Sequence, residues 1–70
     1  MNIEQYFSAS RAIHEEMAQI ATTTGTMAVA QSAHPGNPQF VGLMRRHATL
    51  VAQFQDIHRQ FVASNPHYAA

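Results

Sequence analysis

His34-Pro35-Gly36-Asn37-Pro38, near the middle of the chain, is the stretch of sequence that decides the fold. Two prolines and a glycine within these residues predict a turn over 34–37. Asn37 followed by Pro38 is typical of a helix start, because asparagine caps the free amides of the first helical turn and proline fits the first helical position. Apolar residues recur at helical spacing on both sides of this turn. The sequence therefore predicts an all-α fold, an antiparallel helical hairpin.

The segment after the turn, 38–64, is the more apolar of the two predicted helices. Asn65 and Pro66 predict where it ends, since asparagine tolerates the left-handed conformation that often follows a helix and proline cannot continue one. On a helical wheel its apolar face spans roughly 200°, against about 100° for an ordinary surface helix. The residues of this face that we assign to a candidate partner or oligomer interface are Phe40, Leu43, Met44, Leu50, Val51, Phe54, Ile57 and Phe61.

The segment before the turn predicts a helix over 2–21, with a narrower apolar face of about 140°. Asn2 and Gln5 have the spacing of a capping box at its start. The sequence Thr-Thr-Thr-Gly-Thr at 22–26 disfavours a helix by roughly 3 kcal/mol relative to alanine. We therefore expect a bent or interrupted first helix, with either an extension or a short third helix reaching residue 33. A tail at 65–70 completes the single expected domain, 1–70.

The size of the chain argues for association. A 70-residue, 7.8-kDa domain buries only about 60% of its unfolded surface, and without cysteine it has no disulfide or thiolate metal site to brace it. The apolar face of the second helix is also too wide for the first helix to cover. We expect a homo-oligomer, a dimer forming a four-helix bundle or something larger, or a protein partner that provides a groove.

The charge content limits the classes of partner. Charged residues make up 11% of the chain, and the formal net charge is zero. These values argue against nucleic acid and membrane surfaces as partners, because both require a cationic field. No apolar run approaches the roughly 20 residues of a membrane span. No secretory signal is visible at the N-terminus, which favours a cytoplasmic location, with export that needs no cleaved signal as the alternative.

Two clusters suggest other functions. Arg45 and Arg46 lie outside the apolar face and form a possible charged contact for an acidic partner, which keeps a small DNA-associated regulator as an alternative. His14 and His58 are weak metal-ligand candidates, since a turn centred near residue 36 places them level with each other, and a histidine-ligated metal or haem bundle is the second alternative. We expect no metal or cofactor, because the paired Glu-x-x-His motifs of di-iron bundles are absent.

Catalysis is the least supported class. Ser10 and His14 lie one turn apart, which is a nucleophile and base spacing, but no third group is evident to orient the histidine. The absence of lysine and cysteine excludes Schiff-base and thiol chemistry. The sequence thus predicts a small non-enzymatic protein–protein interaction module, an assembly subunit, adaptor or inhibitor, that acts through an apolar helical face.

Overall fold

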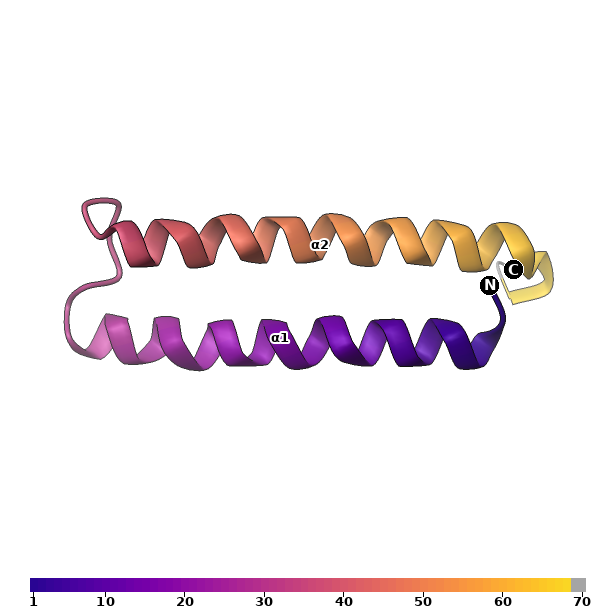
Figure 1. The fold of residues 1–70 in the computed structure, drawn as a ribbon, viewed down its shortest axis with the longest axis horizontal. Coiled ribbons are helices and arrows are strands. Elements are labelled where there is room, and N and C mark those ends of the chain that lie inside the picture. Colours follow the sequence, from indigo (N-terminus) through magenta and orange to yellow (C-terminus); the bar gives the residue numbers. More distant parts are fainter. Residues whose placement is uncertain (69–70) are drawn as a thin grey trace.

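The fold is an antiparallel helical hairpin (Figure 1). The computed structural model describes residues 1–68, which form α1 (Ile3–Val29), α2 (Pro38–Ser64) and a short 3-10 turn, η1 (Pro66–Tyr68). The molecule measures 47 × 17 × 16 Å, and the start of α1 and the end of α2 lie at the same end of the hairpin. The predicted all-helical fold of two helices packed against each other is confirmed.

Both helices begin with the expected caps. The Asn2 side chain accepts a hydrogen bond from the Gln5 amide at 2.8 Å, and the Gln5 side chain accepts one from the Asn2 amide at 2.9 Å, which completes the capping box. Asn37 Oδ1 accepts from the Gln39 amide, while Asn37 Nδ2 donates to the Ser32 carbonyl. One asparagine therefore starts α2 and also fastens the loop that leads into it.

The expected bend or interruption at 22–26 does not occur, and no short third helix follows it within the described residues. α1 continues to Val29, and the hydroxyls of Thr22, Thr23, Thr24 and Thr26 donate to backbone carbonyls four residues earlier at 2.9–3.1 Å. Met27, which follows this stretch, is buried, whereas Val29 at the end of the helix is exposed. The threonine hydrogen bonds and the burial of the Met27 side chain accompany a helix that continues through residues of poor helix propensity.

α1 ends in a Schellman motif that the sequence analysis does not predict. The Ser32 amide donates to the Met27 carbonyl at 2.7 Å, and the Gln31 amide donates to the Ala28 carbonyl at 3.1 Å. Gln31 adopts a left-handed conformation with φ of 61°, a position usually taken by glycine. α2 ends differently from expectation, because its C-cap Asn65 has φ of −136° and is not left-handed. Its side chain instead donates to the carbonyls of Phe61 and Met1, which ties the end of α2 to the residues that precede α1.

The core is a single seam between the helices. Its buried residues are all apolar, and Leu50, 1% exposed, is the most enclosed of them. Partly buried Met17, Leu43, Phe54 and Ile57 pack against this seam. The buried residues of the described chain are Ile13, Ile20, Met27, Leu50 and Phe61. A seam this thin covers only one side of each helix, so most of the remaining apolar side chains stay in contact with solvent.

Candidate protein-interaction surface

One long side of the hairpin carries an apolar groove. The groove has a volume of about 510 Å³, and the buried Ile20 forms part of its lining. A second hollow of about 360 Å³ lies beside it toward the chain termini. Spacings of three and four residues place the other lining side chains along one side of each helix. We call this surface the open face and define it by Tyr6, His14, Met17, Ala18, Ala21, Thr24, Met44, His47, Phe54, Gln55, His58 and Arg59.

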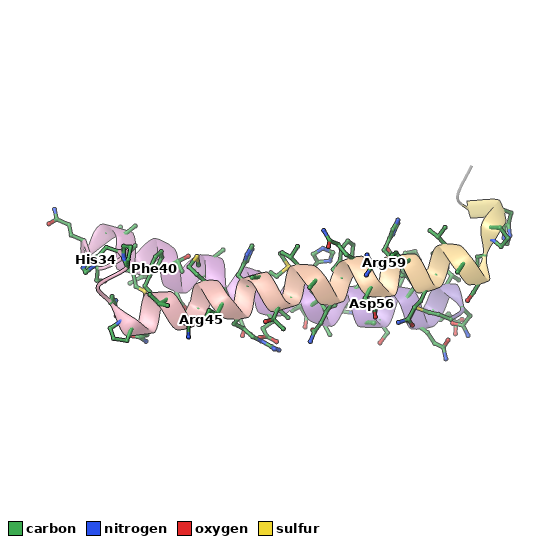
Figure 2. The ribbon with its side chains drawn as sticks, turned by 90° about the horizontal axis from the view of Figure 1, so that it is seen from above. His34, Phe40, Arg45, Asp56 and Arg59 are labelled. Carbon is green, nitrogen blue, oxygen red and sulfur yellow. The ribbon has the colours of Figure 1, made fainter. Side chains whose placement is uncertain are left out.

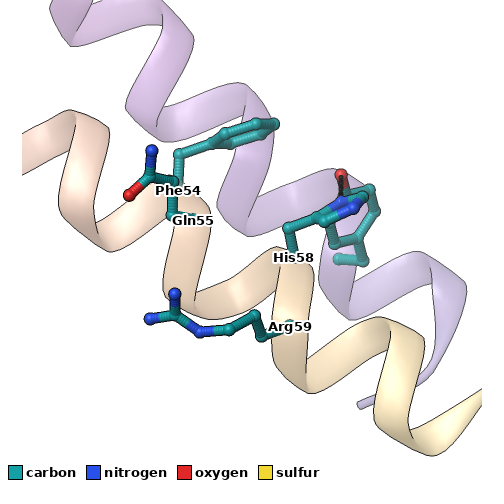
Figure 3. Close-up of a pocket in the computed structure, with 5 residues that line it drawn as sticks. Phe54, Gln55, His58 and Arg59 are labelled. Atoms are coloured by element: carbon teal, nitrogen blue, oxygen red, sulfur yellow. Dashed lines mark hydrogen bonds between the residues drawn. The ribbon is translucent and has the colours of Figure 1, made fainter.

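The end of the open face near the termini is an aromatic cluster. The Tyr6 ring stacks on Phe61 with centroids 4.6 Å apart, and Tyr6 Oη shares a hydrogen bond of 3.2 Å with His58 Nδ1. The Phe54 ring lies 6.4 Å from His58 in a stacked arrangement. Figure 3 shows Phe54 and His58 on the α1 side of this hollow, with the Arg59 guanidinium directed away from the rings. The cluster thus presents aromatic faces and leaves its cation at the rim.

The opposite side of the hairpin is polar and internally paired. Arg46 Nη2 donates to Glu16 Oε1 at 2.8 Å, and Arg46 Nε donates to Glu16 Oε2. The hydrogen bonds from Arg46 lower the pKa of the Glu16 carboxyl, and the same bonds raise the pKa of Arg46. A smaller hollow of about 230 Å³ beside this pair is lined by Glu16, Gln19, Thr23 and Arg46 together with the apolar Ile20 and Leu43. On this side, polar and charged side chains therefore border the apolar seam.

The arginines proposed as a charged contact are separated by the structure. Arg46 pairs with Glu16 of α1, whereas Arg45 lies on the outward side of α2 (Figure 2). Arg11 and Arg59 also lie beside carboxylates, Glu15 at 3.0 Å and Asp56 at 3.6 Å. Three of the four arginines therefore have an acidic neighbour within the chain, and the two adjacent arginines do not form one basic patch.

The structure divides the predicted interface residues into three groups. Leu50 and Phe61 are buried within the hairpin, so the packing of α1 against α2 already uses their side chains. Met44 is 37% exposed and borders the groove. The others are half-buried: Phe40, Leu43, Val51, Phe54 and Ile57.

The predicted interface residues all lie on the second helix, whereas the hollows of the structure are also lined by α1. Tyr6, Met17 and Ala21 line the open face, and Phe7, also on α1, is 61% exposed. The signal for these residues is the apolar spacing of α1. Two straight helices meet along a line, so each leaves a flank uncovered.

The predicted alignment of His14 with His58 is wrong. The His14 ring packs on Phe54 with centroids 5.0 Å apart and shares a hydrogen bond of 3.3 Å with Ser10, whereas His58 is bonded to Tyr6. The loop covers 30–37, so its midpoint lies near 33 or 34 and not near 36 as predicted. This difference changes which residues of α1 lie level with which residues of α2. Among residues 1–68, no three His, Cys, Asp or Glu side chains gather where they could hold a metal ion.

The hairpin is extended and well exposed for its mass. Its accessible surface is 4953 Å², whereas a compact 7.8-kDa monomer exposes about 4,400 Å². Its radius of gyration is 15.4 Å, against about 11 Å for a compact 70-residue domain. Neither α1 nor α2 is long and apolar enough to cross a membrane. The chain matches no family model, no curated protein and no solved structure in the comparisons with known proteins.

Proposed function

We propose that this protein is a non-enzymatic protein–protein interaction module, an assembly subunit, adaptor or inhibitor, that acts through its open face. The observation that carries the proposal is the groove of about 510 Å³ formed jointly by α1 and α2. Its lining combines methionine, alanine and imidazole side chains and includes neither aspartate nor glutamate. Depletion of charge and enrichment in methionine and aromatic residues are typical of the centre of protein interfaces.

The asymmetry between the two sides supports the same proposal. Glu16 and Arg46 form an ion pair with each other on the polar side, so neither side chain requires a charged group from another protein. On the open face, Met44 and the other groove residues border an open hollow, and Met44 is 37% exposed to solvent. A continuous apolar surface that crosses two helices loses contact with water when another protein covers it.

Site-specific photo-crosslinking in the native cell tests this proposal. A photoreactive phenylalanine analogue replaces Met44 on the open face in one variant and Thr49 in the matched control, an exposed residue of α2 one turn after Arg45. We expect a discrete crosslinked adduct from position 44, its loss when Ala21→Asp is added, and no such adduct from position 49. Equal crosslinking from both positions would contradict an interface on the open face.

A further inference from the structure

We infer that the partner of the open face is a second copy of this chain, and that two hairpins packed open face to open face form a closed four-helix dimer. This inference rests on the proposed function, because it names the protein that the interaction module binds. It is carried by three independent properties of the described chain: the area left exposed, the length of the groove and the charge of its lining.

The surface that the hairpin exposes is large enough to include a dimer contact. The hairpin exposes roughly 600 Å² more than a compact monomer of its mass. A standard protein interface buries about 800 Å² on each partner. A contact of that size would bring the exposed surface of each chain close to that of a compact protein, and a single layer of two helices would become the two-layer arrangement of ordinary domains.

The length of the groove favours a rod-shaped partner. On α1 the open face extends from Tyr6 to Thr24, which corresponds to about 27 Å at 1.5 Å per residue. A partner that covers this surface must present an apolar strip of the same length and width. A second hairpin meets this requirement without any change in shape, because its own open face is the matching strip, and a twofold axis closes the assembly at two copies.

The charge of the open face also suits a second copy. Among its residues only Arg59 carries a permanent charge, and this side chain lies at one end, 3.6 Å from Asp56 of its own helix. Two such faces meet without opposing carboxylates and without a central cluster of like charges when their histidines are neutral. A strongly acidic partner would leave its charges opposite Met17, Ala21 and Met44, where no cation compensates them.

Sedimentation equilibrium and light scattering of the full chain test the inference. We expect the mass of two chains at concentrations up to about 200 μM, since interfaces of this size correspond to micromolar or tighter binding. Ala21→Asp and Met44→Asp each place a carboxylate in the covered groove, so we expect the dimer dissociation constant to rise at least about a hundredfold. Thr49→Asp, at an exposed residue of α2, leaves it within about twofold.

Circular dichroism of each variant separates loss of association from loss of helix. A monomeric wild-type chain throughout the concentration range overturns the inference, as does a dimer that both open-face variants leave intact. A monomer whose position 44 still crosslinks to a different protein, with loss of the adduct in Ala21→Asp, refutes the second copy and leaves the proposed function standing. A monomer with no adduct from position 44 refutes both.

Discussion

Glu16 and Arg46 form a two-point ion pair that joins the middle of α1 to the first half of α2. The two residues are 30 positions apart in the chain, so their contact depends on how the helices are aligned and not on local spacing. The pair lies on the polar side of the hairpin, and the apolar flanks of both helices lie on the other side. It therefore helps to decide which surface remains available for association.

We predict that this pair gives the hairpin an acid-sensitive contribution to stability. Because the pKa of Glu16 is lowered in the folded state, its contribution is present above the ordinary value of 4.5 and is lost as the pH falls below it. An ordinary carboxyl group becomes protonated between about pH 5 and pH 3. Over this range the melting temperature of Glu16→Gln should therefore change less than that of the wild type. Glu15→Gln, which alters the exposed pair with Arg11, is the control, and equal acid sensitivity in wild type and Glu16→Gln would contradict the prediction.

Gln31→Gly should stabilise the hairpin by about 1 kcal/mol, because glycine adopts the left-handed conformation without the steric cost that a side chain carries. Urea unfolding, monitored by circular dichroism at fixed concentration, measures the change. Ala30→Gly is the matched control, since Ala30 has φ of −81° and gains nothing from glycine. A neutral or destabilising Gln31→Gly would show that the Schellman motif tolerates glutamine without strain.

Gly42→Ala should raise the free energy of unfolding by about 1 kcal/mol, because Gly42 lies inside α2 and an added Cβ meets open space. Gly36→Ala provides the contrast, since a Cβ there lies 3.0 Å from His34 Nδ1 in the turn. Thermal melts of the two variants should move in opposite directions. Stabilisation by both changes would mean that the turn readily accommodates a side chain.

Leu50→Ala should cost about 3 kcal/mol and reduce helix content, because Leu50 is the most enclosed side chain of the seam. Met44→Ala, on the open face, should keep its helix content and weaken only the proposed self-association. Circular dichroism and sedimentation of the same samples measure both properties. If Met44→Ala unfolds the chain as fully as Leu50→Ala does, the division between seam and open face is incorrect.

The helical hairpin was predictable from the sequence because its signals are local. Asn37 and Pro38 start α2, and Asn2 with Gln5 starts α1, through hydrogen bonds between side chains and backbone that lie close in the chain. The apolar spacing of each segment likewise reflects the period of a single helix. The sequence alone therefore determined the type and the antiparallel order of the two main helices, whereas the continuity of α1 through 22–26 was decided by the structure.

The tertiary structure decided what depends on the position of one helix against the other. The midpoint of the loop sets the axial alignment, which brings His14 to Phe54 and not to His58. The rotation of the helices places Leu50 inside, and it brings Met17 of α1 onto the open face. Neither quantity is encoded at one position, because both result from the packing of the whole seam and from the length of the loop.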